Sequence, residues 1–349
     1  MAAVAAGPAW VRNMILSLLL LTVAATTPKP SELKTFRDWA VGCDNGRACH
    51  ATSLLPEHGD QEPGVMFSIE RGAEPGAQPR LTVTGTEGKG FALNAAGKKF
   101  RLRPAPGSTD QRVDPAQVGA AIAAMRTAPA LTVEDGSGSP LGTISLAGVS
   151  AAMLYIDDVQ KRVGTVTALA RPGLRPASTV PAPPPVPTIR SAAGPGTLKI
   201  ETARIAALRK ESECIAENAD WPGYDVEQEP LDSAHTLILL GCGAGAYNFS
   251  SIPYVATRAR GNVTVTQAKF DLKPDWGESA TPMLVNAAWD SKEGLLTSFS
   301  KGRGLGDCGV GSDYAWDGQR FRQANQIEMH ECRGSVDYIT TWRATVVRH

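Results

Sequence analysis

The sequence has no excess of charge of either sign and no motif that would identify a nucleotide site. Its 349 residues include 35 basic and 35 acidic side chains, which argues against nucleic acid as a main partner because phosphate contacts need a basic excess. No Gly-Lys-Ser/Thr occurs, so the phosphate-binding loop is excluded. Gly302, Gly304 and Gly306 alternate, but Asp307 stands where a dinucleotide fingerprint needs its third glycine, and no helix pattern follows.

The sequence also lacks the G-x-S-x-G and H-E-x-x-H motifs of hydrolases and metalloproteases. An enzyme would have to recruit a general base from five scattered histidines, because histidine is the usual one. These are His50, His58, His235, His330 and His349. We therefore assign no catalytic residue, no cofactor and no metal site from the sequence.

Long apolar runs are missing as well, since none approaches the ~20 residues of a membrane-spanning helix. Arg12 precedes the short apolar run 14–21, and Val23, Ala24 and Ala25 follow it with small side chains. This order is typical of a secretory signal. It predicts a signal peptide over residues 1–25, cleavage near Ala25, and a periplasmic or secreted mature chain with no transmembrane span. Met14 is an alternative start of the chain.

All six cysteines lie beyond the predicted cleavage site, and their even number in an exported chain indicates disulfides. Their order along the chain favours bridges between neighbours. We predict three sequential disulfides, Cys43–Cys49, Cys214–Cys242 and Cys308–Cys332. A zinc site is disfavoured, because Cys43 and Cys49 are farther apart than paired zinc ligands usually are.

Proline divides the chain. Residues 176–196 are rich in proline, which predicts a semi-rigid extended linker. The linker separates an N-terminal domain over residues 33–175 from a C-terminal domain over residues 197–349.

Short apolar runs punctuated by glycine turns predict mainly antiparallel β structure in both domains. Alternation over 36–43, a turn at Asp44-Asn45-Gly46 and the return from Cys49 predict a first hairpin. Asp114 with Pro115 predicts the start of one helix, and a second is expected from near Ser150. A third is predicted over 201–217. The expected class is α+β and β-rich, with each domain resembling a sandwich or barrel.

Adjacent carboxylates on the second predicted helix could suggest acid/base chemistry. Asp157 and Asp158 are neighbours in sequence, but neighbouring helix residues diverge by about 100° and do not face each other. We interpret both as solvated side chains or as ion-pair partners of Lys161 and Arg162.

The stretch 301–318 is the densest glycine cluster in the chain, and it carries Lys301, Arg303 and Asp307. One interpretation is a binding loop whose backbone amides and Arg303 face an anion. The alternative, which the general rarity of functional glycine turns favours, is a tight strand crossing pinned by Cys308. Tyr247 and Asn248, in a second polar segment, are further binding candidates, although a structural turn explains them equally well.

Several motifs together resemble the DUF1176 family of secreted bacterial proteins. The opening FRDWAVGCDN at 36–45, the segment IDDVQKRVGT at 156–165, YNFSS at 247–251 and KGRGLGDCG at 301–309 match that family, and the likeness extends over nearly the whole mature chain. The first domain also resembles the invasion-associated locus B family through its Asp-Trp-x-x-x-Cys opening. Neither resemblance supplies catalytic residues.

These observations favour a non-catalytic binding or envelope-associated protein with an unidentified envelope or protein partner. Two alternatives stay open. One is a hydrolase-like enzyme centred on Asp307, Tyr247 or a histidine. The other is a secreted inhibitor that presents a rigid loop.

Overall fold

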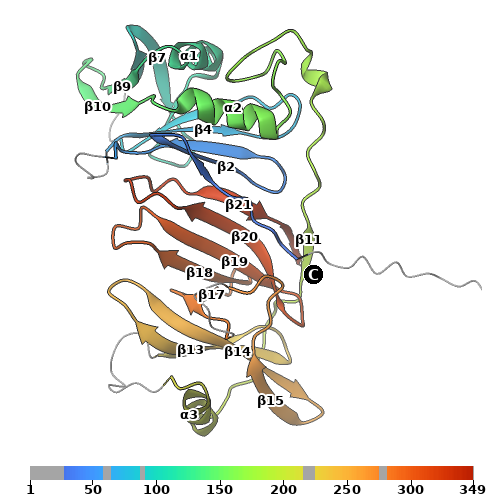
Figure 1. The fold of residues 1–349 in the computed structure, drawn as a ribbon. Coiled ribbons are helices and arrows are strands. Elements are labelled where there is room, and N and C mark those ends of the chain that lie inside the picture. The colour runs from blue at the N-terminus through green and yellow to red at the C-terminus, as the bar shows by residue number, and fades with distance from the viewer. Residues whose placement is uncertain (1–26, 58–63, 87–90, 215–224, 275–280, 349) are drawn as a thin grey trace, which may run out of the picture.

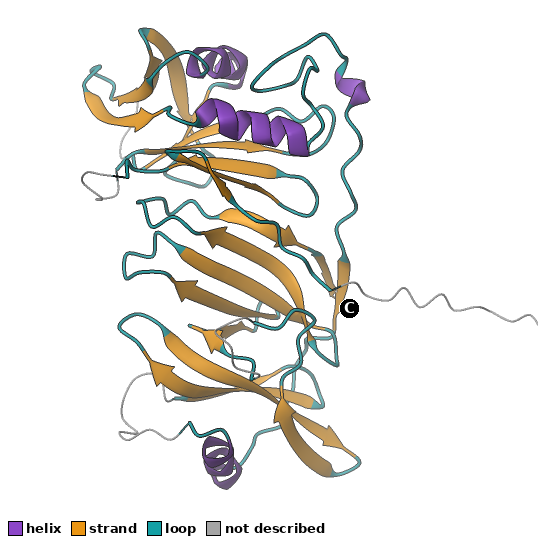
Figure 2. Ribbon diagram, in the orientation of Figure 1, coloured by secondary structure: helices purple, strands orange, loops and turns teal. Residues whose placement is uncertain are grey.

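The computed structural model describes residues 27–57, 64–86, 91–214, 225–274 and 281–348. The predicted signal peptide with its cleavage site near Ala25 lies outside the described residues, as do His58 and His349. The rest is β-rich with short helices, and its sheets are stacked as layers (Figure 1, Figure 2). This arrangement confirms the predicted α+β class.

The first half of the chain forms a single ten-stranded antiparallel sheet in the order β1-β2-β3-β4-β5-β8-β7-β6-β9-β10. Two helices lie on it (Figure 1). The strands are β1 (Lys34–Thr35), β2 (Trp39–Cys43), β3 (Cys49–Ser53), β4 (Met66–Arg71), β5 (Arg80–Thr84), β6 (Ala92–Ala95), β7 (Lys98–Pro104), β8 (Gln111–Val113), β9 (Ala130–Glu134) and β10 (Pro140–Ser145). The helices are α1 (Val118–Met125), which follows the 3₁₀ turn η1 (Pro115–Gln117), and α2 (Val149–Val159).

Local chemistry explains where these helices begin. The Asp114 side chain accepts a hydrogen bond from the Ala116 amide, and Pro115 occupies the first turn, as the sequence predicted. Before α2, Gly148 has φ +97°, and a Cβ there would lie 1.7 Å from the Phe36 carbonyl oxygen. Only glycine fits this close approach. Both helices therefore begin at residues that suit a helix start.

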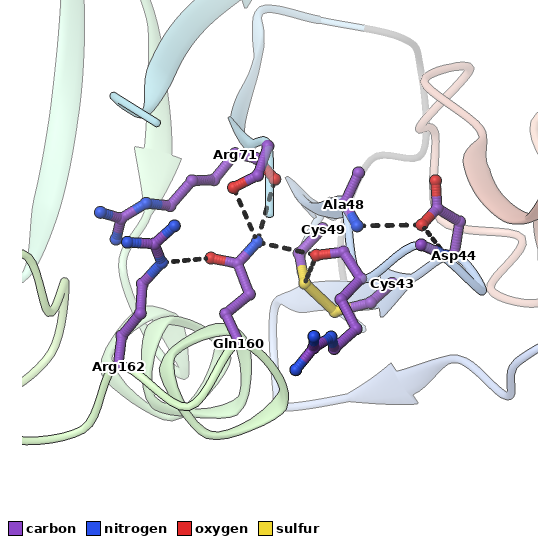
Figure 3. The surroundings of a disulfide bond; sticks show 10 residues. Cys43, Asp44, Ala48, Cys49, Arg71, Gln160 and Arg162 are labelled. Atoms are coloured by element: carbon purple, nitrogen blue, oxygen red, sulfur yellow. Dashed lines mark hydrogen bonds between the residues drawn. A yellow bond between two sulfur atoms is a disulfide. The ribbon is translucent and has the colours of Figure 1, made fainter. Parts of the chain in front are cut away.

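The first hairpin, β2–β3, is fastened from two sides (Figure 3). Cys43 and Cys49 face each other in register and form the predicted bridge. Gln160, at the end of α2, donates to the carbonyl oxygens of Arg47, Arg71 and Gly72 at 2.9–3.2 Å. One buried amide thus joins the disulfide hairpin, strand β4 and helix α2, so the helix is held in a fixed position over the sheet.

The second half forms three further sheets. A sheet of β12-β13-β14-β15, with β16 also paired to β14, faces a sheet of β17-β18-β19-β20-β21, and β11 pairs with β22. The strands are β11 (Thr188–Ser191), β12 (Val226–Pro230), β13 (His235–Ala244), β14 (Phe249–Ala259), β15 (Asn262–Gln267), β16 (Leu284–Val285), β17 (Ala288–Asp290), β18 (Leu295–Lys301), β19 (Gly309–Trp316), β20 (Phe321–Met329), β21 (Ile339–Arg343) and β22 (Thr345–Arg348). The helix α3 spans Thr202–Glu211, and a 3₁₀ turn, η2, spans Ala177–Thr179.

Strand β13 is buried on both faces, which explains its continuous apolar run. Leu237 and Leu239 pack toward the β17–β21 sheet with Trp316. Ile238 and Leu240 pack on the opposite face in the cluster that includes residues of α3. A sandwich with an additional helix layer results, in agreement with the sequence. The Cys214–Cys242 bridge joins the chain beyond α3 to this strand, also as predicted.

Two expectations about helices need correction. The third helix was predicted over 201–217, but α3 ends at Glu211 because Ser212 and Glu213 leave the helical path, Glu213 with φ +58°. The prediction beyond Cys214 lies outside the described residues. The interpretation of Asp157 as a solvated side chain is wrong, because this residue is fully buried. Asp158 is exposed and lies 3.7 Å from Lys161, as expected.

The proline-rich segment runs from the first sheet down the side of the molecule to β11 (Figure 1). Its last part is not a free spacer, because β11 pairs in parallel with β22. No sheet in the described part of the chain mixes strands from before and after this segment. The division into two independently folding domains stays a prediction, to be tested by expressing 33–175 and 197–349 separately.

Strand β21 lies beside the first sheet, so the two halves share an apolar contact (Figure 1). Leu33, Ala40 and Leu54 from the first half pack with Met329 and Ile339 from the second. Polar contacts flank this cluster. In one of them, Arg333 donates to the Leu55 carbonyl oxygen at 2.7 Å and to the Asp38 carboxylate at 2.5 Å. The halves are therefore packed against each other and are not merely tethered.

In the residues that the structure describes, no helix combines the length and the apolar character that crossing a bilayer demands. All six cysteines are paired in the three predicted bridges. Disulfides of this kind persist in oxidising compartments, so the chain is one that folds outside the reducing cytoplasm.

Candidate functional site

The glycine-rich stretch is the loop of a β-hairpin. Lys301 at the end of β18 pairs with Gly309 at the start of β19, and residues 302–308 connect them. A Cβ at Gly302 would lie 2.7 Å from the Cys308 sulfur, and one at Gly309, which has φ +146°, would lie 2.1 Å from the Ser300 carbonyl oxygen. Both glycines are therefore required by the close crossing beside the Cys308–Cys332 bridge.

Arg303 and Asp307 pair with each other inside this loop. The guanidinium donates from Nε to Oδ1 at 2.7 Å and from Nη2 to Oδ2 at 2.5 Å, and Oδ2 also accepts from the Gly334 amide at 2.7 Å. The Asp307 side chain is 1% exposed and that of Arg303 is 32% exposed. The bond from Arg303 lowers the pKa of Asp307, so the carboxylate stays charged. This carboxylate is saturated by internal donors.

The neighbouring tyrosine strengthens the same arrangement. The Tyr338 hydroxyl donates to the Gly306 carbonyl oxygen at 3.0 Å. Burial raises the pKa of Tyr338 to about 12, which keeps the hydroxyl protonated as a donor. Arg303 and Asp307 thus stabilise the tight crossing of the two strands, which was the alternative to ligand binding. Neither residue lines the cavity described next.

A second hairpin loop, residues 245–248 between β13 and β14, lies against the first. Asn248 accepts from the Lys301 amide at 3.1 Å and donates to the Lys301 carbonyl oxygen at 2.9 Å. The Tyr247 hydroxyl donates to the Gly302 carbonyl oxygen at 3.3 Å. Asn286 supports the contact, because its amide donates to Asn248 Oδ1 at 3.0 Å. The two segments that the sequence analysis selected independently are therefore in direct contact.

These two loops border an open cavity of about 540 Å³, which we call the loop cavity. Tyr247, Asn248 and Lys301 line it, together with Ser250 and Ser300. In the described part of the chain, the Lys301 ammonium group has no ion-pair partner. A basic residue and two serines therefore border a space large enough for a small ligand, since such sites usually occupy about 300–1,000 Å³.

The described histidines are each held by a carboxylate or hydroxyl group. His235 contacts Asp232 at 2.8 Å and packs on Trp316 with ring centroids 5.2 Å apart. His330 contacts the Thr35 hydroxyl at 2.7 Å. These contacts join strands or the two halves of the chain, so they account for both residues without a catalytic role.

Sequence reasoning missed a third histidine contact, which lies at the junction of the halves. His50 on β3 is 3.0 Å from the Asp337 carboxylate, and the two side chains are 16% and 29% exposed. His50 also lines a polar cavity of about 400 Å³ with Glu70 and Arg80. No local pattern signals this pair, because its members are 287 residues apart in sequence.

The pair should make stability depend on pH. Burial lowers the pKa of His50, and so does the charge of Arg80. The hydrogen bond and charge of Asp337 raise this pKa, as does the charge of Glu70, and together they outweigh the lowering effects, so the pKa is raised overall. Burial raises the pKa of Asp337, and His50 and Ser68 more than offset it, so this pKa is lowered. The contribution of His50 to the free energy of unfolding is complete below the pKa of about 6.5 that histidine has in the unfolded chain. It is lost as pH rises through the pKa of His50 in the folded protein. The aspartate contribution is lost only as pH falls below about 3.9.

We therefore expect His50→Gln to lower the melting temperature most between about pH 4.5 and 6.5, and less at about pH 8. The measurement is thermal unfolding of both proteins across this range. A difference that is the same at every pH would show that the pair contributes no charge interaction.

Two comparisons with known proteins match most of the chain, and a third matches a smaller part. A family model described as "Protein of unknown function (DUF1176)" matches residues 33–346. The uncharacterized protein YpfG of Escherichia coli strain K12 is 29% identical over 356 residues, which cover 93% of this chain and 96% of that protein. The crystal structure of invasion associated protein B from Bartonella henselae is similar over 38% of this chain and 99% of its own, with 22% identity and a TM-score of 0.28.

Proposed function

Since the chain belongs to the DUF1176 family, as its motifs indicated, we propose that it is a non-catalytic binding protein of the bacterial envelope, periplasmic or secreted. Its ligand, free or part of a protein partner, carries a carboxylate or phosphate group that enters the loop cavity. The three disulfides support an oxidising location, and the relative that is 29% identical is a bacterial protein.

The observation that carries this proposal is the position of Lys301. This residue lines the loop cavity, and no carboxylate among the described residues pairs with it. Most basic side chains near the cavity's sheet have partners, such as Arg303 with Asp307 and Arg322 with Asp271. An anionic group of a ligand is the chemistry that would complement this cation.

The other candidates have distinct roles in this proposal. Tyr247 lines the cavity, so it is placed to contact the ligand directly. Both polar atoms of the Asn248 amide are engaged by the backbone of Lys301, so Asn248 positions the lysine. The Arg303–Asp307 pair keeps the loop rigid, and a rigid loop loses less entropy when it binds.

The test compares Lys301→Glu with Lys292→Glu. Lys292 is exposed in the β17–β18 turn of the same sheet, and no ion pair holds it among the described residues. In pull-downs from envelope extracts, we expect the partner captured by the mature wild-type chain to be lost with Lys301→Glu and retained with Lys292→Glu. Equal recovery with both variants would overturn the proposed site.

A further inference from the structure

A third cavity, of about 450 Å³, lies in the first half of the chain, far in sequence from the loop cavity. It is formed by the start of β5, the β7–β8 hairpin and the beginning of α1, and we call it the arginine cavity. Strands β5 and β8 pair only at Thr82–Arg112 and Val83–Gln111. The ladder does not continue to Leu81 and Val113, so a gap opens between the strands at that level.

The floor and walls of the arginine cavity are largely apolar. Leu81, Val113 and Val118 are core residues that reach it. Four prolines line the remaining walls, and proline has no backbone N–H to offer. They are Pro79, Pro104, Pro106 and Pro115. The cavity therefore suits a hydrocarbon or an aromatic group better than a polar ligand.

Three arginines line the cavity, and only one of them lacks a carboxylate. Arg103 bonds to Asp114 at 2.6 and 2.8 Å, and Arg80 pairs with Glu70. Arg112 has no ion pair among the described residues, although it lies directly opposite Arg103 in the β7–β8 register. Like charges placed directly opposite on a sheet destabilise it. The site is thus built with one positive charge that the protein does not neutralise.

Two polar atoms beside this charge are also unsatisfied. Among the described residues, Arg112 Nε is buried without a hydrogen-bond partner, and so is the hydroxyl of Thr82, the residue paired with Arg112 on its other side. Buried polar groups almost always have partners, so orphaned ones require an explanation. An anion that reaches the Arg112 guanidinium would supply one for the arginine.

We propose that the arginine cavity binds a small amphiphilic carboxylate. The carboxylate pairs with the Arg112 guanidinium, whose planar donors fit it in two parallel hydrogen bonds. The apolar chain lies over Leu81, Val113 and Val118, between the prolines. This site is independent of the loop cavity, so either assignment can fail without the other.

The test uses decanoate as the probe and the mature full-length chain. Isothermal titration calorimetry should show saturable binding of decanoate, and binding at least about tenfold weaker for 1-decanol, which has the same chain without the charge. Arg112→Gln should weaken decanoate binding about 10- to 100-fold, the range expected for a hydrogen-bonded charge. Arg101→Gln is the matched control, because Arg101 is an exposed arginine of β7 that does not line the cavity.

A second variant protects the test against misfolding of Arg112→Gln. Gly119 lines the cavity from α1, and a Cβ there would meet no other atom within 4 Å. Gly119→Leu should therefore fold, since glycine is a poor helix residue, and it should block decanoate binding. Equal affinity of wild type, Arg112→Gln and Gly119→Leu for decanoate would overturn the proposal, and so would absence of decanoate binding by the wild type.

Discussion

The Asp157→Ala variant is expected to lose about 3–5 kcal/mol of unfolding free energy, the usual cost of removing one member of a buried ion pair. Its carboxylate accepts from the amides of Leu169 and Ala170, both at 2.8 Å. Two guanidinium groups depend on its charge. Arg71 lies 3.9 Å away with a side chain 2% exposed, and Arg162 is fully buried.

The pKa of Asp157 explains why this network is sensitive. Burial raises that pKa. Hydrogen bonds from two backbone amides and the charges of Arg71 and Arg162 lower it, but they do not fully offset burial, so the pKa is raised overall. The charged carboxylate is therefore kept in an unfavourable environment by a few specific contacts. Removing it leaves two amides without their acceptor and Arg71 without its counter-charge, and each such group is costly. Arg162 loses one of the two carboxylate charges that favour it and keeps that of Glu74.

The adjacent residue provides the matched control. Asp158 is exposed, and its one described ion pair, to Lys161 at 3.7 Å, is solvated. Asp158→Ala should change the unfolding free energy by no more than about 0.5 kcal/mol. Chemical denaturation of both variants measures the difference. If the two alanine variants prove equally stable, the Asp157 network does not hold α2 and the chain after it in place.

The second large effect is expected at the glycine-rich loop. Asp307→Ala should cost about 2–4 kcal/mol, because it leaves the Gly334 amide without an acceptor and the Arg303 guanidinium without its counter-charge. Arg303→Ala should cost about 1–3 kcal/mol, since solvent can partly replace a side chain that is 32% exposed.

Arg320→Ala serves as the control for this loop, because Arg320 is exposed and makes no described ion pair. It should leave the melting temperature nearly unchanged. Were Arg303→Ala as stable as Arg320→Ala, the pairing with Asp307 would be dispensable, and Arg303 would again be a candidate to contact a ligand.

Local signals in the sequence predicted much of the fold. The turn at Asp44-Asn45-Gly46 between Cys43 and Cys49 marked the first hairpin and its bridge, and Asp114 with Pro115 marked a helix start. These features succeed because they depend on a few neighbouring residues. The glycine-rich stretch and a separate polar segment also pointed to Lys301, Tyr247 and Asn248, which the structure brings to one cavity.

Features set by distant contacts were not predicted. The His50–Asp337 pair and the junction around Ile339 depend on how two distant parts of the chain pack. The burial of Asp157 had a weak signal, because it lies four residues after buried Met153 and three before buried Gln160, on the inward stripe of α2. A polar residue on such a stripe indicates a buried network, but its partners come from other elements.

The parallel pairing of β11 with β22 has a consequence for the order in which the chain folds. The partner of β11 is made only after all the chain from α3 to β21. Until then the segment after the prolines has exposed strand edges while the first sheet can already form. Pairings between distant segments form slowly. We therefore expect the pairing of β11 with β22 to be a late step of folding.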